Sequence, residues 1–265
     1  MRRFLGALAA IVVSIQTFAA PLDHGDLVRL TTRDGVTQSI FIESPAPNPD
    51  WVVVLFPGTP GALHLDATGA TTLRGNFLVR SASHWLEAGD AVVLVDTPSD
   101  KADGVDDLFR LSSESFADSK AVVANVRQRF PNAKIALVGT SAGTVSVGNA
   151  AQRDPSLADA YVLTSPVTVS RRGGGTLASL DVDGTKYRGL VVSNQHDECA
   201  SSPPYAAKQL ADHNHFDFVS MDSGEGSGDK TTECQGHSPH GFLGIERQVL
   251  GGIQDWLLRK SEVAK

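Results

Sequence analysis

Residues 139–143, Gly-Thr-Ser-Ala-Gly, are the part of the sequence whose types and spacing most directly indicate chemistry. They follow a run rich in apolar residues, 134–138, and precede small residues suited to a helix. A tight strand-to-helix turn holds its serine in a strained conformation and requires small residues two positions away on either side. The helix start also directs N–H groups, that of Ala142 among them, toward developing negative charge. The pattern predicts Ser141 as a nucleophile, and a simple connecting turn is the alternative.

A serine hydroxyl is a weak nucleophile, so this prediction requires a base and an acid elsewhere in the chain. The acid candidate is Asp197, which follows the apolar run 189–193. The loop beyond the carboxyl end of a parallel strand is where α/β sheets present functional groups. Glu198 and Asp222 are the alternative acids. The base candidates are two histidines in a later loop.

Those histidines are His237 and His240. Two further histidines, His213 and His215, alternate at an expected helix-to-strand junction without a third ligand. This pattern is more often found in surface residues than in a metal site. We therefore predict no metal and no cofactor.

The elements that must position these residues follow from the apolar pattern. Short runs rich in Val, Ile and Leu, separated by stretches long enough for helices, indicate parallel strands with crossover helices. The runs cover residues 51–56, 91–95, 134–138, 161–164, 189–193 and 216–221. Residues 27–43, with Asp-Gly at 34–35, indicate an antiparallel hairpin at one edge. Helices are expected over 76–88, 114–130 and 242–258, and a mobile surface loop over 170–184.

Length and composition indicate a globular α/β protein. The chain has 265 residues, of which 41% are apolar and 20% charged, so repetition and wholesale disorder are both excluded. We expect one domain over residues 20–265. Residues 1–19 have the features of a signal peptide: Arg2 and Arg3, then an apolar run too short for a confident membrane span, then small residues. An uncleaved anchor is the less favoured interpretation.

Export would shape the charge and the cysteines. Removing Arg2 and Arg3 changes the formal net charge from −7 to −9, which disfavours nucleic acid or an anionic membrane as a partner. Cys199 and Cys234 are the only cysteines, and in an oxidising compartment they are expected to form a disulfide. This disulfide would tie the loop of Asp197 to the histidine loop. We expect a periplasmic or extracellular location and no membrane anchor after cleavage.

The segments GTSAGT, HDEC and SPHGFLGIE resemble those of the α/β-hydrolase superfamily, and in particular exported dienelactone-hydrolase-like esterases. The resemblance implies a mostly parallel sheet with helices on both faces, and the chain order serine, acid, histidine. It favours His240 as the base, with His237 lining the pocket. It also implies that the N–H of Thr59 joins that of Ala142 as an oxyanion donor. Pro57 replaces the family's histidine in this loop.

The expected function is hydrolysis of a carboxylic ester, small or polymeric, through an acyl-enzyme on Ser141. The residues between Thr164 and Leu190 are too few for a large lid, so bulky esters could enter. An amidase, peptidase or thioesterase would use the same three side chains, because the pocket decides the substrate. A non-catalytic binding protein on the same scaffold is the alternative from a different class.

Overall fold

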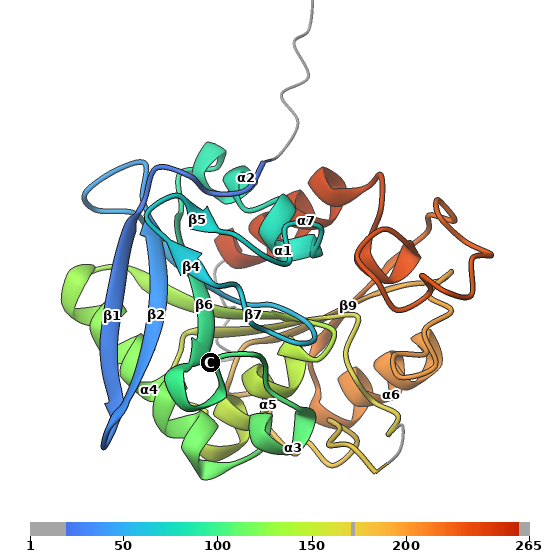
Figure 1. The fold of residues 1–265 in the computed structure, drawn as a ribbon. Coiled ribbons are helices and arrows are strands. Elements are labelled where there is room, and N and C mark those ends of the chain that lie inside the picture. Colours follow the sequence, from blue (N-terminus) through green and yellow to red (C-terminus); the bar gives the residue numbers. More distant parts are fainter. Residues whose placement is uncertain (1–19, 171–172, 260–265) are drawn as a thin grey trace, which may run out of the picture.

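The computed structural model describes residues 20–170 and 173–259, so the expected signal peptide lies outside the described residues. Its centre is one eight-stranded sheet (Figure 1). In spatial order the strands are β1 (Asp26–Arg33), β2 (Val36–Glu43), β6 (Ala91–Pro98), β3 (Trp51–Phe56), β7 (Lys134–Thr140), β8 (Ala160–Thr164), β9 (Gly189–Asn194) and β10 (Asp217–Met221). The β1–β2 and β2–β6 pairs are antiparallel, and every pair from β6 to β10 is parallel.

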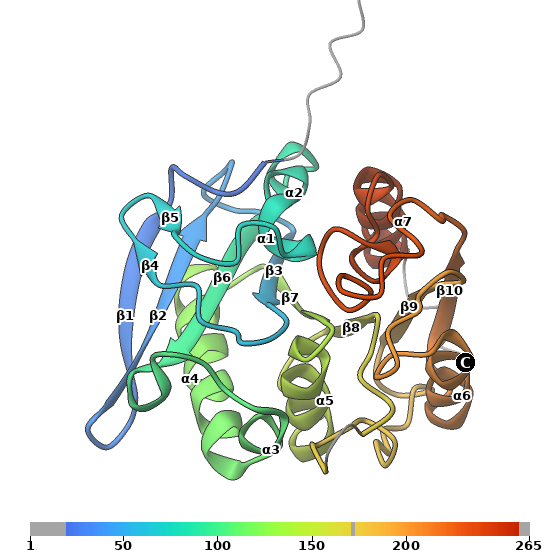
Figure 2. The same ribbon diagram turned by 45° about the vertical axis from the view of Figure 1, so that its right-hand side comes forward.

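Helices cover both faces of the sheet (Figure 2). One face carries α4 (Ser113–Arg129), α5 (Gly143–Arg153) and α6 (Pro204–Asn214), with the short α3 (Asp107–Arg110) against α4 and α5. The other carries α1 (Phe77–Arg80), α2 (Ser83–Glu87) and α7 (Glu246–Leu258). A small ribbon of β4 (Leu65–Asp66) and β5 (Gly69–Ala70) and two 3₁₀ turns, Ser99–Lys101 and Pro239–Gly241, complete the fold.

Strand β3 shows why the central strands are continuous apolar runs. All six of its side chains are buried. Val52 and Val54 belong to the core cluster that includes residues of α4, α5 and α6, whereas Val53 and Leu55 belong to the cluster of α1, α2 and α7. A strand covered on both faces needs apolar residues at every position rather than at alternate ones.

The predicted fold class is confirmed: a mostly parallel sheet with helices on both faces. All six predicted strand runs are strands, with ends that differ by a few residues, and the predicted hairpin is β1–β2. Gly35 has φ 67° in the hairpin turn, a conformation that glycine adopts without steric cost. In the described ranges, no helix has both the length and the apolar composition needed to cross a membrane.

The single helix predicted over residues 76–88 is wrong, because two short helices, α1 and α2, occupy this range. The break lies at Ser81, whose hydroxyl donates to the carbonyl of Phe77 and whose backbone N–H turns to Val79. A serine that bonds to the preceding helical turn competes with the regular backbone ladder. The second core cluster includes buried side chains of both helices, Phe77 and Trp85 among them.

The last helix begins at Glu246 rather than at residue 242. Residues Pro239–Gly241 form a 3₁₀ turn, and Phe242 and Gly244 have φ angles of 55° and 78°. Positive φ angles interrupt a right-handed helix, so α7 starts only beyond them. The residues just after His240 therefore form a loop.

The segment expected to be a surface loop, residues 170–184, has no helix or strand among its described residues. Three of its side chains nevertheless contribute to the core: Leu177, Leu180 and Val182 are buried in the same cluster as residues of α5. The segment is therefore attached to the sheet's helical layer rather than lying wholly on the surface.

Candidate active site

Ser141 lies in the tight turn between β7 and α5, at the carboxyl end of a central strand. Its φ angle is 51°, which is uncommon for a residue with a side chain. The turn is held by two backbone hydrogen bonds: the Ser141 N–H donates to Thr164 O at 3.0 Å, and the Thr144 N–H donates to Ser141 O at 2.9 Å. Such strain is found where surrounding structure enforces it, and here the neighbouring strand does so.

The two glycines of the motif are required by close packing. A Cβ on Gly143 would lie 2.0 Å from Phe56 O, and one on Gly139 would lie 2.6 Å from Gly143 O. Both neighbours are backbone atoms, which cannot rotate away as a side chain could. The lack of a side chain at Gly143 lets the turn approach β3, and the lack of one at Gly139 lets β7 approach the start of α5.

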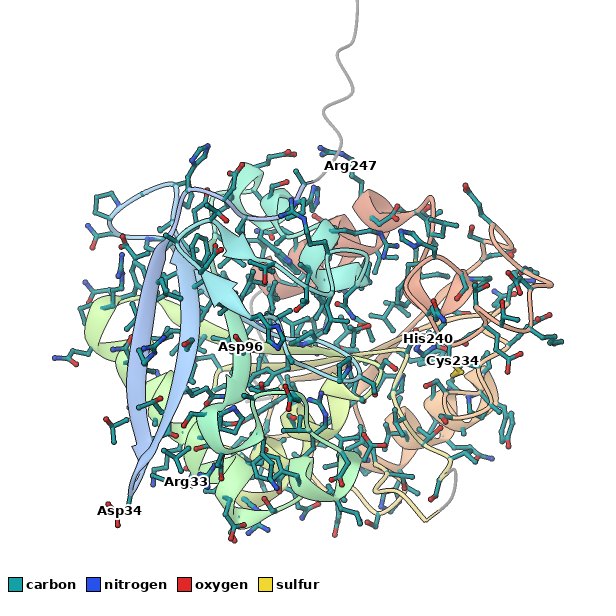
Figure 3. All side chains as sticks on the ribbon, in the orientation of Figure 1. Arg33, Asp34, Asp96, Cys234, His240 and Arg247 are labelled. Atoms are coloured by element: carbon teal, nitrogen blue, oxygen red, sulfur yellow. A yellow bond between two sulfur atoms is a disulfide. The ribbon has the colours of Figure 1, made fainter. Side chains whose placement is uncertain are left out.

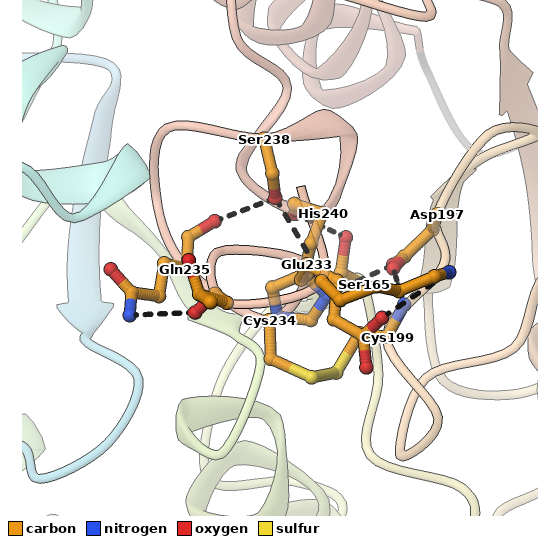
Figure 4. Close-up of a disulfide and its surroundings, with 10 residues drawn as sticks. Ser165, Asp197, Cys199, Glu233, Cys234, Gln235, Ser238 and His240 are labelled. Carbon is orange, nitrogen blue, oxygen red and sulfur yellow. Dashed lines mark hydrogen bonds and ion pairs between the residues drawn. A yellow bond between two sulfur atoms is a disulfide. The ribbon is translucent and has the colours of Figure 1, made fainter. Parts of the chain in front are cut away.

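His240 and Asp197 form a buried pair in two different loops (Figure 4). His240 Nδ1 and Asp197 Oδ2 are 2.9 Å apart, with side-chain exposures of 4% and 0%. The other carboxylate oxygen, Oδ1, accepts the N–H of Cys199 at 2.9 Å. With the carboxylate on Nδ1, the neutral imidazole keeps its proton there, so Nε2 is the acceptor.

The backbone around His240 is anchored from three directions. Ser165 donates its hydroxyl to His240 O at 2.7 Å, and Asn194 Nδ2 donates to the preceding carbonyl, that of Pro239, at 3.1 Å. Arg80 donates to the following carbonyl, that of Gly241, at 2.7 Å. These contacts join the histidine loop to the ends of β8 and β9 and to α1. The imidazole is thus positioned by its backbone as well as by Asp197.

Ser141 and His240 line the same pocket, whose volume is about 560 Å³. His240 Nε2 is buried and makes no hydrogen bond to any group of the described residues, so the structure does not join it to the Ser141 hydroxyl. Catalytic hydrogen bonds are often long before substrate binds. The arrangement leaves the acceptor nitrogen unoccupied within the pocket that also contains the serine.

Neither alternative acid contacts His240. Glu198 pairs with Lys230 at 3.1 Å, and Asp222 pairs with His196 Nε2 at 2.8 Å, with its side chain 70% exposed. Of the three candidates, only Asp197 contacts the imidazole of His240.

The other three histidines considered in the sequence analysis, all within the described residues, do not contact Asp197 through a hydrogen bond. His237 lines the pocket and packs on Gly75, at which a Cβ would lie 2.8 Å from the His237 ring. His213 and His215 are exposed at the end of α6. Among these, only His237 is close enough to the site to contact a bound molecule.

Cys199 and Cys234 form the predicted disulfide, with their Cα atoms 4.7 Å apart. Figure 4 shows this disulfide beside His240 and Asp197. Both cysteines line the pocket. In the described chain, the one group of three potential metal ligands close enough to share an ion is Asp197, Cys199 and His240. Its sulfur belongs to the disulfide and its other two members bond to each other, so the group does not offer a thiolate site. The prediction of no metal stays a prediction.

The expected oxyanion donors lie beside Ser141. Thr59 and Ala142 both line the pocket, and no backbone hydrogen bond within the described part of the chain engages either N–H. An oxyanion bound there would be held by two fixed dipoles at the start of α5 and in the loop after β3.

Arg110 supports this loop, a role that the sequence analysis did not predict. It is 3% exposed and donates to Pro57 O at 3.3 Å and to Ser146 Oγ on α5 at 3.0 Å. Burial lowers the pKa of Arg110 to about 10, while Asp107 acts in the opposite direction. The guanidinium remains charged at neutral pH and links the oxyanion loop to the helix that follows Ser141. A single arginine in a four-residue helix carries no pattern that could have revealed this.

Comparison with known proteins agrees with this geometry at the level of the fold. No family model matches the sequence, and no curated protein matches it. A solved α/β serine hydrolase without a lid from Xanthomonas campestris is similar, with 18% identity, TM-score 0.57, and coverage of 91% of this chain and 99% of the other. An α/β serine hydrolase homologue from Coxiella burnetii has 18% identity and a TM-score of 0.59, with coverage of 88% of this chain and 97% of the other. An esterase from Pyrococcus furiosus has 12% identity and a TM-score of 0.61, with coverage of 89% of this chain and 92% of the other. The chain therefore has the α/β-hydrolase fold. In agreement with the expectation of no large lid, the described residues between β8 and β9 form no helix or strand.

Proposed function

We propose that the protein is a serine hydrolase that cleaves carboxylic esters through an acyl-enzyme on Ser141. One observation carries this proposal: a strained serine at a strand-to-helix turn shares a pocket with a buried histidine whose other nitrogen is bonded to a carboxylate. Nucleophile, base and orienting acid are the three groups that acyl transfer requires. Esterases and serine hydrolases with this fold support the same reaction class.

In the proposed first step the Ser141 Oγ bonds to the ester carbonyl carbon while His240 Nε2 takes the hydroxyl proton. Asp197 stabilises the imidazolium, and the N–H groups of Thr59 and Ala142 hold the oxyanion. The imidazolium then gives its proton to the departing alcohol oxygen as the carbon–oxygen bond breaks. Water then attacks the carbonyl carbon of the acyl-enzyme while His240 Nε2 takes its proton. The imidazolium returns this proton to Ser141 Oγ as the bond to the acyl group breaks, which releases a carboxylic acid.

An ester panel graded by acyl length, applied to the parent and to Ser141→Ala, tests the proposal. Losing the nucleophile should lower kcat by roughly a millionfold. Ser156→Ala, at an exposed position beyond the far end of α5, is the matched control and should match the parent. Ester turnover by Ser141→Ala within about tenfold of the parent would contradict the proposal.

An amidase, peptidase or thioesterase would show the same mutational pattern. Amides and thioesters of the best acyl group in the panel separate these activities, because only the leaving group differs. We expect the ester to have the largest kcat/KM.

A non-catalytic binding protein is the second candidate, and the unpartnered His240 Nε2 is the observation that favours it. A fluorophosphonate probe distinguishes the two, because it bonds covalently only to an activated serine. Probe mass found on Ser141 supports the hydrolase. A folded protein that remains unlabelled, with no turnover of any ester, supports binding.

We further propose that residues 1–19 direct export and that residues 20–265 form one mature domain, acting in the periplasm or outside the cell. A disulfide is typical of such compartments. The test is the N-terminal sequence of the exported protein, which should begin at Ala20.

A further inference from the structure

We propose that the side-chain amide of Asn76 is a third hydrogen-bond donor to the oxyanion, in addition to the N–H groups of Thr59 and Ala142. This inference rests on the proposed function. Asn76 comes from the segment before α1, far in sequence from the nucleophile, yet it lines the same pocket as Ser141.

The orientation of the amide is fixed by its other end. Asn76 Oδ1 accepts the backbone N–H of Leu78 at 3.1 Å, as the N-cap of α1. Because Oδ1 is held on that N–H, the planar amide is fixed in orientation, and Nδ2 occupies the other arm of its fork. Nδ2 has no acceptor among the described residues, so its two N–H bonds remain for a bound molecule.

The amide lies close both to the nucleophile and to the loop that carries Thr59. Asn76 Nδ2 and Ser141 Cβ lie 3.4 Å and 3.2 Å from one point, the position that a Cβ on Gly58 would occupy. Gly58 immediately precedes Thr59, the expected loop donor. A side chain on Gly58 would touch both the amide and the serine, and the absence of one leaves that space to a substrate oxygen. His240 reaches the pocket from a separate loop, after β10.

The segment of Asn76 is rigid enough to supply such a donor. The Asn76 N–H donates to Leu73 O at 2.8 Å, and Arg80 donates to the preceding carbonyl, that of Gly75, at 2.8 Å. The next residue, Phe77, is 1% exposed and packs on Phe242 with ring centroids 5.0 Å apart. A donor that is already positioned needs no reorganisation when negative charge develops, which is why such groups stabilise transition states.

The proposed role of Asn76 is to donate a hydrogen bond, and it involves no proton transfer or covalent step. As Ser141 Oγ attacks, the carbonyl oxygen gains negative charge, and an amide N–H donor is worth more to that oxyanion than to the neutral carbonyl. Removing one such side-chain donor typically costs about 10² to 10³ in kcat. The loss should therefore fall mainly on kcat rather than on KM.

Two substitutions remove the donor but keep the helix cap. Asn76→Ser retains a hydroxyl acceptor for Leu78 without adding charge, and Asn76→Asp retains the shape but presents a carboxylate oxygen where Nδ2 stood. Asn132→Asp is the matched control, because Asn132 is exposed beside the amino end of β7, at the opposite edge of the sheet from Ser141. Thermal unfolding of all variants shows whether the fold is retained.

Ester hydrolysis should fall roughly a hundredfold in kcat for Asn76→Ser and further for Asn76→Asp, with unchanged unfolding midpoints. The second readout compares each ester with its thionoester, whose sulfur accepts hydrogen bonds weakly. Loss of a donor should shrink the parent's preference for the oxygen ester by about the same factor, whereas a merely structural change would not alter it.

If Asn76→Ser keeps kcat within about twofold, or if the oxygen-to-sulfur preference is unchanged, Asn76 is not an oxyanion donor. That result leaves the proposed function intact, provided that the parent hydrolyses esters and Ser141→Ala does not. An inactive parent overturns both proposals.

Discussion

The two halves of the candidate site are built in different ways. The nucleophile half is local: five consecutive residues, 139–143, span the junction of β7 and α5 and are fixed by contacts with the neighbouring strands β3 and β8. The His240–Asp197 half joins two loops that are 43 positions apart, after β9 and β10. In Figure 3, His240 and Cys234 lie together near one edge of the sheet, well away from the β1–β2 hairpin tip at Asp34.

This difference determines what each half depends on. The turn that carries Ser141 depends on the absence of side chains at two glycines, because a Cβ added at either would meet backbone atoms. The histidine half depends on added connections: a disulfide, the Arg80 contacts and the hydrogen bond from Ser165. The first half should therefore be sensitive to single added atoms, and the second to the loss of a connection.

Apart from the loss of the nucleophile itself, the largest effect should come from altering the link between the loops of the second half. Asp197→Asn presents an N–H to His240 Nδ1 and so favours the wrong tautomer, which should lower kcat by about 10⁴. Asp222→Asn is the control and should stay within about twofold of the parent. If kcat on the same ester falls more for Asp222→Asn than for Asp197→Asn, Asp222 rather than Asp197 is the acid that orients the histidine.

An added methyl group should damage the first half less than this, but still strongly. Gly143→Ala forces a Cβ to within 2.0 Å of Phe56 O, so the turn must shift and the reacting atoms lose alignment. We expect kcat to fall at least a hundredfold and the thermal midpoint to drop. Gly252 lies inside α7, and a Cβ added there would have no atom within 4 Å. Gly252→Ala should therefore raise the free energy of unfolding by about 0.5–1 kcal/mol. Equal behaviour of the two variants would refute the packing argument.

Loss of the disulfide should separate function from stability. The double substitution of Cys199 and Cys234 by serine removes a crosslink across 35 positions, which the chain-entropy model values at about 3–4 kcal/mol. At temperatures where circular dichroism shows both proteins folded, we expect kcat to fall roughly tenfold or more, because the two loops are less precisely placed. Unchanged kcat would mean that the disulfide stabilises the fold without positioning the site.

The smallest effect should lie outside both halves, at the amino end of β6. Asp90 is 3% exposed, and burial raises its pKa to about 6, with Asp50 adding to the effect. The folded state therefore favours the protonated acid, and this contribution to stability is lost as pH rises from about 4 through 6. Asp90→Asn should raise the thermal midpoint above pH 6, with little change at pH 4 and none in kcat. A midpoint difference that does not vary with pH would contradict this titration.

The fold was predictable where burial alone determines the residue pattern. The run from Trp51 to Phe56 is apolar throughout because both faces of β3 are covered. The break at Ser81 was not predictable, because its cause is one side-chain hydrogen bond to a neighbouring carbonyl and the apolar pattern continues across it. The late start of α7 depends on positive φ angles at Phe242 and Gly244, and a bulky Phe gives no sign of such a conformation.

The candidate site shows the same division. The sequence indicated Ser141 because its requirements are met by adjacent residues, and it offered Asp197 and His240 among several candidates. Tertiary structure then brings one acid to one histidine. Arg110 and Asn76 could not be identified from the sequence, since each acts on residues distant in the chain and neither belongs to a spaced pattern.

The segment 235–237 is attached at both ends and faces the pocket between them. Cys234 is held by the disulfide, and Ser238 is fully buried with its hydroxyl bonded to nearby carbonyls. Its middle residue, Gly236, must remain glycine, because a Cβ there would lie 2.1 Å from Gly75 O. The two outer positions, Gln235 and His237, carry side chains that line the pocket but belong neither to the turn of Ser141 nor to the buried acid–base pair. For protein engineering they form a compact library site, at which substrate preference can be varied while the catalytic groups are left untouched.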